Sequence, residues 1–199
     1  SDLLSVISQA KDSMQSPEEF IRYWEGVNDW RCIRIGKVYA LYSKKLREAN
    51  ALDFDDIILH TVRLLESCPD VLERYQRKFR YILIDEYQDT NHLQYLLVSL
   101  LAGGWRNICV VGDDDQSIYR FRGADISNIL SFEKEYRGAR TIRLEQNYRS
   151  TQNILDAANA VIRHNEGRKG KTLWTENGDG EKVIIKTAFN ESDEANYVV

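Results

Sequence analysis

The chain has 199 residues, enough for one globular domain, or for one domain and part of a second. It contains 43% hydrophobic and 29% charged residues, and its net charge of −4 excludes nucleic-acid binding through an overall positive charge. Cys32, Cys68 and Cys109 are widely spaced and form no Cys-x-x-Cys pair, which argues against a disulfide framework or a zinc site.

The first 50 residues are predicted to be helical. Ser16-Pro17-Glu18-Glu19 has the features of a helix start: Ser16 can cap the helix, Pro17 suits its first position, and Glu19 completes a capping box. A longer helix is expected from about residue 31 to residue 49. Its basic outer face is interpreted as a solvated surface, with contact to phosphate as the alternative.

Three acidic residues, Asp53, Asp55 and Asp56, begin the next predicted helix. A metal site is one explanation for three acids in four residues. Acids at a helix start are also stabilised by the positive end of the helix dipole, without any metal. We therefore interpret them as residues of the first helical turn.

Three buried strands are predicted at about residues 81–84, 107–112 and 141–144, because aliphatic runs bounded by polar residues are typical of parallel strands. Helices are expected between and after these strands, at about 92–102, 125–136 and 151–165. Strands and helices that alternate at this spacing indicate right-handed crossovers. The predicted fold class is therefore α/β, with a parallel sheet flanked by helices.

Each predicted strand is followed by polar residues that suit phosphoryl transfer. Asp85 and Glu86 follow the first strand, Gln116 the second, and Tyr148 and Arg149 the third. The carboxyl ends of parallel strands form the edge where ligands bind, and carboxylates, an amide and an arginine can hold a metal ion, orient water and neutralise phosphate charge. The alternative for the first pair alone is that it ends a strand before a helix capped by Asp89 or Thr90.

A loop that cradles phosphates is missing from the sequence. Gly170-Lys171-Thr172 resembles the end of such a loop, but the position five residues before Gly170 is Asn165 instead of glycine, and a helix precedes it instead of a strand. Residues 167–172 are therefore interpreted as a basic surface loop.

Three long motifs together resemble motifs II, III and IV of the UvrD/PcrA/Rep-type superfamily 1 DNA helicases. They are Asp85-Glu86-Tyr87-Gln88-Asp89-Thr90, the segment from Gly112 to Ala124 (GDDDQSIYRFRGA), and Leu144-Glu145-Gln146-Asn147-Tyr148-Arg149-Ser150. Their order and spacing extend the resemblance across nearly the whole chain. It implies a RecA-like sheet of the P-loop NTPase type, with ATP and Mg²⁺ as cofactors.

The resemblance also implies a role for each site residue. Asp85 would coordinate Mg²⁺, and Glu86 would be the catalytic base toward the attacking water. Gln116 would contact the γ-phosphate and relay its presence to the DNA site. Tyr148 would stack on the adenine, and Arg149 would reach the γ-phosphate.

Three further residues, Tyr119, Phe121 and Arg122, fall where the family couples nucleotide state to single-stranded DNA. Phe121 stands where tryptophan is common in the family, and its smaller ring stacks on a base over less area. Core packing is the alternative for the two aromatic side chains.

The expected domain organisation is that of a middle segment. Residues 1–50 resemble the end of a helical subdomain, residues 51–175 the later half of the first motor domain, and residues 176–199 the start of the second. The phosphate loop would lie before Ser1 and the remaining motifs after Val199, so the segment alone is expected to be inactive.

The resemblance implies an ATP-dependent 3′-to-5′ DNA helicase of DNA repair or replication. Its partners would be single-stranded DNA, duplex junctions and repair proteins. No apolar run reaches the roughly 18 residues of a membrane span, so the expected location is the cytoplasm. Two alternatives stay open: the motor portion of a helicase-nuclease subunit, and a non-hydrolysing scaffold that binds DNA or protein.

Overall fold

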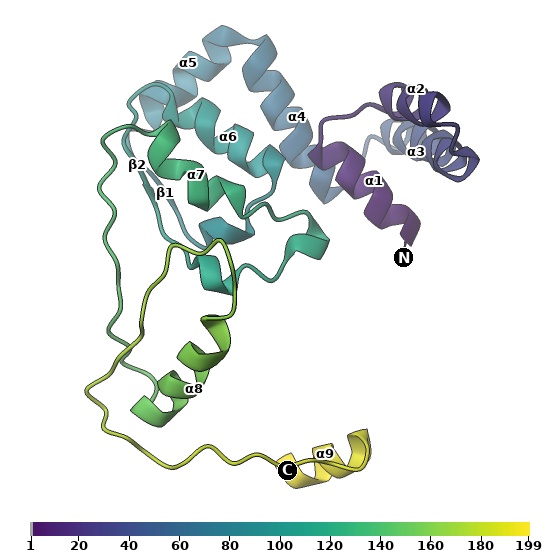
Figure 1. The fold of residues 1–199 in the computed structure, drawn as a ribbon. Coiled ribbons are helices and arrows are strands. Elements are labelled where there is room, and N and C mark those ends of the chain that lie inside the picture. The colour runs from purple at the N-terminus through teal and green to yellow at the C-terminus, as the bar shows by residue number, and fades with distance from the viewer. Residues whose placement is uncertain (1) are drawn as a thin grey trace. The chain divides into compact units, whose positions relative to one another are not determined.

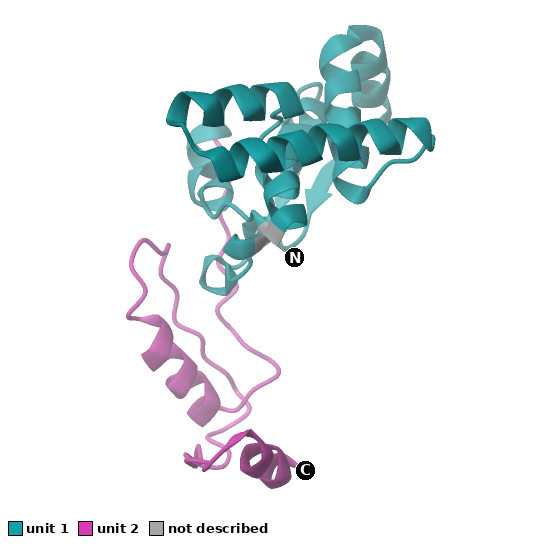
Figure 2. Ribbon diagram, turned by 90° about the vertical axis from the view of Figure 1, so that its right-hand side faces the viewer, with its two compact units in different colours: residues 1–137 teal, residues 138–199 magenta. Residues whose placement is uncertain are grey.

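The computed structural model describes residues 2–199, apart from the side chains of Asp2 and Arg122. The chain divides into two compact units, residues 1–137 and residues 138–199 (Figure 2). Among the described residues, no helix has both the length and the apolar character that crossing a membrane requires.

Unit 1 combines helices with a small parallel sheet (Figure 1). Its elements in chain order are α1 (Asp2–Asp12), α2 (Pro17–Val27), α3 (Trp30–Glu48), α4 (Phe54–Ser67), α5 (Pro69–Lys78), β1 (Ile82–Ile84), the 3₁₀ turn η1 (Tyr87–Asp89), α6 (His92–Ala102), β2 (Ile108–Val110), the 3₁₀ turns η2 (Asp114–Gln116) and η3 (Arg120–Arg122), and α7 (Ser127–Glu135).

The predicted helix starts are confirmed. Ser16 caps α2 and forms the capping box with Glu19, and Pro17 occupies the first turn. Asp53 caps α4 in the same way, through a capping box with Asp56. The acidic cluster at residues 53–56 therefore has the helix-starting role that the sequence indicated.

The N-terminal helices pack around a core made by Ile7, Ala10, Phe20 and Tyr39 from α1, α2 and α3. In Figure 1, α2 and α3 lie side by side. A second core, made by Leu59, Val62 and Leu93, joins α4 to α6. Each core buries one apolar side of its helices, and this burial is the main favourable contribution to folding.

A buried cation connects α1 with α4. The Lys11 side chain is 1% exposed, and its Nζ lies 2.6 Å from Asp53 Oδ2 and 2.7 Å from Asp56 Oδ1. The Tyr42 hydroxyl of α3 donates a 2.9 Å hydrogen bond to the same Asp53 oxygen. Burial raises the pKa of Asp53, but the hydrogen bonds from Lys11, the Asp56 backbone and Tyr42 outweigh it and hold that pKa below its ordinary value. Lys11 therefore neutralises carboxylates that also begin α4.

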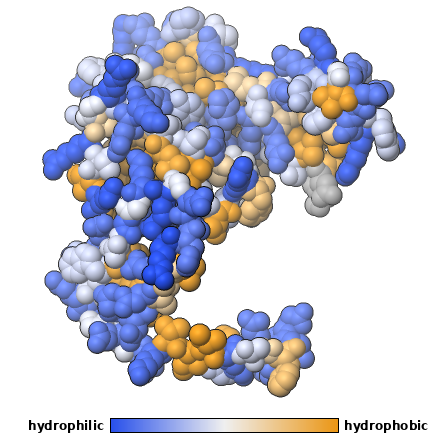
Figure 3. Space-filling view, viewed as in Figure 1, coloured by the Kyte–Doolittle hydropathy of each residue, from blue (hydrophilic) through white to orange (hydrophobic). Residues whose placement is uncertain are grey.

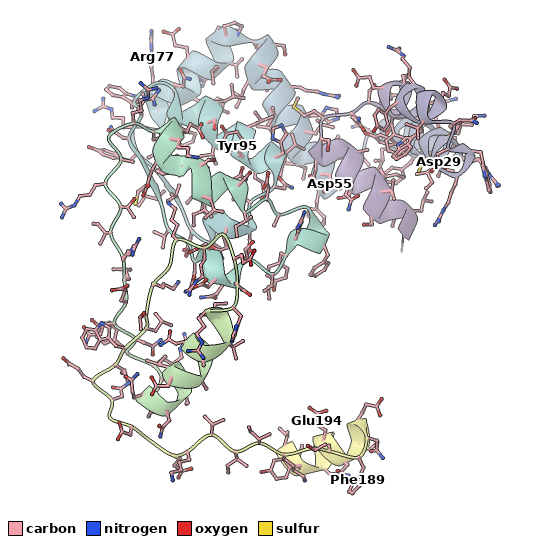
Figure 4. The ribbon with its side chains drawn as sticks, viewed as in Figure 1. Asp29, Asp55, Arg77, Tyr95, Phe189 and Glu194 are labelled. Carbon is pink, nitrogen blue, oxygen red and sulfur yellow. The ribbon has the colours of Figure 1, made fainter. Side chains whose placement is uncertain are left out.

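β1 and β2 pair in parallel, with Leu83 opposite Cys109 in register. Two of the predicted strands are thus confirmed in position, but the expectation that they are buried is wrong, because Leu83 is 74% exposed and Cys109 is exposed. The α6 helix connects them, and its labelled Tyr95 donates a 2.8 Å hydrogen bond to Glu135 at the end of α7 (Figure 4). This contact attaches α7 to the connecting helix of the parallel pair.

The third predicted strand is not formed. Residues 141–145 are irregular, and Ile142 and Leu144 are 67% and 78% exposed. The nearest regular feature is an isolated bridge between Gln146 and Trp174. A strand needs a regular backbone ladder with a neighbouring segment. Here the Trp174 N–H donates to the Glu145 carbonyl at 3.1 Å and the Asn147 N–H donates to the Trp174 carbonyl at 2.7 Å, which makes a single bridge instead of a ladder. The expected larger RecA-like sheet is therefore represented by the parallel pair of β1 and β2.

Unit 2 contains α8 (Gln152–Ile162) and α9 (Glu191–Val198), joined by a long irregular segment. Thr151 is the N-cap residue of α8, close to the predicted start of this helix at about residue 151. Gly170-Lys171-Thr172 lies in the irregular segment, after a helix and away from any strand. Apolar side chains are exposed beside α9, among them Phe189 and Val198 (Figure 3).

Replacing Lys11 with methionine is expected to lower the free energy of unfolding by about 3–5 kcal/mol, because Asp53 and Asp56 would keep buried charges without their cation. Urea denaturation followed by circular dichroism measures this change. Lys44→Met is the matched control, since Lys44 forms an exposed pair with Glu48 at 3.7 Å and its loss should change stability by only about 0.5 kcal/mol. Equal effects of the two substitutions would contradict the role given to Lys11.

Asp12 is expected to make the stability of the fold depend on pH. Burial, aided by the charge of Asp55 (labelled in Figure 4), raises the pKa of Asp12 to about 6, against the hydrogen bond from Asn91. Its contribution to stability is therefore present below its ordinary pKa of 3.8 and is lost as the pH rises through about 6.

The substitution Asp12→Asn is expected to remove this pH-dependent loss of stability. Because Asp12 is only half-buried, we expect a gain of about 1 kcal/mol at neutral pH and none near pH 4, which is about 2–4 °C in Tm. Thermal unfolding at the two pH values checks it. A gain of the same size at both pH values would assign the effect to packing instead of charge.

Candidate active site

The parallel pairing of β1 and β2 brings the segments that follow them together. The backbone ladder continues past the strands, with the Val111 N–H donating to the Ile84 carbonyl at 2.8 Å and the Tyr87 N–H donating to the Val111 carbonyl at 2.9 Å. Residues 85–90 and 112–117 therefore form one edge. This is the carboxyl edge of the strands, where open parallel sheets bind their ligands.

Asp85 and Glu86 are both exposed at this edge. The Glu86 N–H donates a 3.0 Å hydrogen bond to Asp85 Oδ1. Glu86 itself has a left-handed backbone conformation, with φ 50° and ψ 42°. Few residues other than glycine adopt it, and such strain persists where the surrounding structure enforces it, often at functional sites. Here it turns the chain from β1 into η1.

The next residues of the motif are buried and attach the edge to unit 1. Tyr87 is 1% exposed, and its ring meets that of Phe132 in an edge-to-face contact with centroids 5.9 Å apart. Burial raises the pKa of the Tyr87 hydroxyl above its ordinary range. Thr90 Oγ1 donates to the Tyr87 carbonyl at 2.7 Å and accepts from Asn128 Nδ2 at 3.1 Å. These contacts hold η1 against α7.

The suggestion that Asp89 or Thr90 caps the following helix is wrong. Asn91 caps α6, through a capping box with Gln94. The side chains at positions 85 and 86 are therefore separated from the helix start by a complete 3₁₀ turn. Helix capping does not explain them.

Gln88 joins the two segments of the edge. Its side chain is 1% exposed; Nε2 donates to Glu86 Oε2 at 2.8 Å, and Oε1 accepts from the Asp113 N–H at 2.9 Å. Gln116, which is exposed, donates from its own Nε2 to Asp113 Oδ2 at 2.8 Å. The structure thus brings Asp85, Glu86 and Gln116 to one edge and connects the last two through hydrogen bonds.

Gln88 and Asp113 were not predicted as residues of this edge. Both belong to the motifs that were identified, and their place in those motifs was the available signal. That signal does not tell which way a side chain points from a 3₁₀ turn.

The edge has one carboxylate suited to a magnesium ion. Asp85 is exposed and offers hard oxygen ligands, which Mg²⁺ prefers, and this ion commonly takes one or two carboxylates together with water and substrate phosphates. In the part of the chain that the structure describes, no group of three His, Cys, Asp or Glu side chains gathers around a point. The residues present thus fit an ion shared with a phosphate ligand.

The residues expected to meet DNA follow in the same loop. Tyr119 is 38% and Phe121 69% exposed, and their ring centroids lie 6.0 Å apart. Both rings are therefore available to a base, and neither is buried in a core. The side chain of Arg122 lies outside those that the structure describes.

Tyr148 and Arg149 belong to unit 2. Asn147 Oδ1 accepts from the backbone N–H of Arg149 at 2.9 Å and of Ser150 at 2.7 Å, which forms a tight turn before α8. Tyr148 is 80% exposed, and its hydroxyl donates to Gln146 Oε1 at 3.0 Å. The turn presents an aromatic ring and a guanidinium group at adjacent exposed positions.

Comparison with known proteins identifies both units. Residues 1–137 match the UvrD/REP helicase N-terminal domain, and residues 142–199 match the UvrD-like helicase C-terminal domain.

Relatives of the chain include proteins named ATP-dependent DNA helicase PcrA. The protein from Bacillus subtilis (strain 168) is 55% identical and that from Staphylococcus epidermidis (strain ATCC 35984) 54% identical, each over 98% of this chain and 26% of the relative. The protein from Leuconostoc citreum is 50% identical over 99% of this chain and 26% of the relative. The chain therefore spans about a quarter of the length of these relatives.

Gly112→Ala is expected to disturb this edge. A Cβ atom at position 112 would lie 2.6 Å from Gln88 Oε1, 2.8 Å from Ile129 Cδ1 and 3.2 Å from the Tyr87 nitrogen. We expect a loss of about 1–3 kcal/mol in the free energy of unfolding, measured by urea denaturation. Gly26→Ala in α2 is the control, because nothing lies within 4 Å of its added Cβ and alanine favours a helix. An alanine at position 112 that leaves stability unchanged would show that the edge is loosely packed.

Proposed function

The chain belongs to the UvrD/REP helicase family, and we propose that it forms part of an ATP-dependent DNA helicase that moves 3′ to 5′ along single-stranded DNA in repair or replication. The observation that supports this most directly is the edge of β1 and β2. There two exposed carboxylates and an exposed amide stand on adjacent loops, and hydrogen bonds through the buried Gln88 side chain join these loops. Its relatives are named ATP-dependent DNA helicases, which supports the same function.

In this proposal Glu86 is the general base. It accepts a proton from the water that attacks the terminal phosphate of ATP, and Gln116 contacts that phosphate. Asp85 would hold Mg²⁺, which supplies positive charge to the phosphate oxygens when bound. The exposure of Asp85, Glu86 and Gln116 in unit 1 is consistent with these roles, since each has to reach a ligand.

Unit 2 contributes the other nucleotide contacts that we propose. The exposed Tyr148 ring stacks on the adenine, and the Arg149 guanidinium neutralises charge on the γ-phosphate. Tyr119 and Phe121 of unit 1 stack on DNA bases, and Arg122 binds the strand beside them. Stacking and backbone contacts tolerate any base sequence, as a translocating enzyme requires.

We infer that the expected organisation also holds, with a helical subdomain end at 1–50, motor-domain segments at 51–175 and 176–199, and a phosphate-binding loop supplied by a longer protein. The 199-residue chain alone is then inactive. The compact units divide instead after residue 137, so the boundary near residue 175 stays a prediction.

The experiment is DNA-stimulated ATP hydrolysis by a full-length protein that carries this chain. Glu86→Gln is expected to lower kcat by a factor of about 10²–10⁴ while ATP binding persists, because the amide fits the same space and cannot accept the proton. Glu73→Gln on the exposed surface of α5 is the control and should leave kcat unchanged.

The same preparation should unwind a duplex with a 3′ single-stranded tail and leave one with a 5′ tail intact. Hydrolysis that survives Glu86→Gln would assign the base to another residue. No hydrolysis by the unmodified full-length protein would favour a non-hydrolysing scaffold, and ATP-independent degradation of the DNA would favour a helicase-nuclease.

A further inference from the structure

We propose that Gln88 is a positioning residue that orients the Glu86 carboxylate and connects it, through Asp113, with Gln116. This inference deepens the proposed function and rests on it, because it assigns to Gln88 a role in the same hydrolytic site. The connection runs from the exposed side chain of Glu86 on one loop, through the buried side chain of Gln88, to the exposed side chain of Gln116 on the other loop.

The orientation of the Gln88 amide follows from its two nearest partners, and Nε2 also donates to Asp89 Oδ2 at 3.5 Å. Its Oε1 faces the Asp113 N–H at 2.9 Å, which can only donate, and its Nε2 faces the Glu86 carboxylate at 2.8 Å, which accepts when ionised. Rotating the amide by half a turn would set donor against donor and oxygen against oxygen. One orientation alone satisfies both neighbours.

Burial makes these hydrogen bonds obligatory. The Gln88 side chain is 1% exposed, so water does not replace a lost partner, and an unpaired buried amide group costs about 1–3 kcal/mol. Ser117 Oγ also donates to the Gln88 carbonyl at 3.4 Å, which ties the backbone of η1 to the second loop. Both the side chain and the backbone carbonyl of Gln88 thus form hydrogen bonds with the second loop.

Glycine at position 112 permits this close approach. Any Cβ there would meet Gln88 Oε1 at 2.6 Å, so a larger residue would displace the amide from the Asp113 N–H. Glu86 meanwhile has its left-handed backbone, which directs its side chain back over Gln88 Nε2. Glu86 and Gly112 thus both fix the position of the Gln88 amide, Glu86 at its Nε2 atom and Gly112 at its Oε1 atom.

Asp113 carries the connection to Gln116. Its backbone N–H donates to Gln88, while its carboxylate accepts from Gln116 Nε2 at 2.8 Å through Oδ2 and from the Asp115 N–H at 3.0 Å through Oδ1. The carboxylate therefore holds η2 and the Gln116 side chain together. Asp113 thus contacts both Gln88 and Gln116. When Gln116 moves toward a phosphate, Asp113 moves with it and changes the position of the Gln88 amide.

An exposed general base benefits from such a support. A glutamate side chain has several rotamers, and a misplacement of about 1 Å at a catalytic group can lower a rate by a factor of about 10². A hydrogen bond from a buried amide selects one rotamer before ATP binds. The expected consequence is an effect on kcat with little effect on the KM for ATP.

The test compares Gln88→Met with unmodified full-length protein in DNA-stimulated ATP hydrolysis. Methionine fills a similar volume and lacks both the donor and the acceptor, so kcat should fall by a factor of about 10–10², with KM for ATP within about twofold. Gln76→Met is the matched control: Gln76 is half-buried in unit 1 and donates a 2.8 Å hydrogen bond to the Leu100 carbonyl, away from the edge. It should leave kcat unchanged.

Two further variants separate positioning from support of the fold. Gln88→Glu keeps the acceptor for the Asp113 N–H and replaces the donor with a carboxylate that repels Glu86, so kcat should fall at least as far as in Gln88→Met. In the Glu86→Gln background, adding Gln88→Met should cause no further loss, because the residue through which it acts is already disabled. Gln88→Glu with nearly full activity, or an additive double variant, overturns the proposal, and additivity is the result that a merely structural role predicts.

A measurement without ATP tests the contact itself. In the 199-residue chain, the side-chain amide protons of Gln88 should exchange slowly with solvent, and Glu86→Ala should accelerate that exchange. Exchange as fast as that of an exposed glutamine overturns the proposal even if ATP hydrolysis proceeds. An unmodified full-length protein that hydrolyses no ATP while these amide protons remain protected would instead overturn the proposed function.

Discussion

The parallel register of β1 and β2 is the constraint on which the candidate site depends. Pairing Ile84 with Val110 ends both strands at the same level, and the ladder then continues through Val111 and Tyr87. Val111 is therefore brought within hydrogen-bond distance of both Ile84 and Tyr87. A register shifted by one residue would turn the side chains of β1 to the other face and separate Gln88 from the Asp113 N–H.

The motif at residues 85–90 divides its positions between two tasks. Asp85 and Glu86 are exposed, as residues that meet a ligand must be, whereas Tyr87, Gln88 and Thr90 are buried and attach the turn to its neighbours. The left-handed conformation of Glu86 separates the two groups. The strain of that one residue is balanced by the packing and hydrogen bonds of the three that follow.

The N-terminal helices are tied to the same region by charge and hydrogen bonds. Lys11 binds the carboxylates that begin α4, and the neighbouring Asp12 accepts from Asn91, the N-cap residue of α6. Adjacent residues at the end of α1 thus meet the starts of two other helices. The helix that follows the motif at residues 85–90 is in this way connected to the N-terminal helices of unit 1.

The sequence by itself determined the family, the starts of α2 and α4 and the polar residues that stand after β1 and β2, because these depend on residue type and local order. The capping boxes at Ser16 and Asp53 and the polar residues after β1 and β2 are such features. It also predicted a strand at 141–144, but a strand forms only where a neighbouring segment supplies a regular backbone ladder, and the pairing next to these residues is a single bridge between Gln146 and Trp174. Tertiary structure alone decided that Gln88 faces inward and that Asp113 lies between it and Gln116. The direction of a side chain in a 3₁₀ turn, and its partner on another loop, follow from packing and register instead of from local sequence.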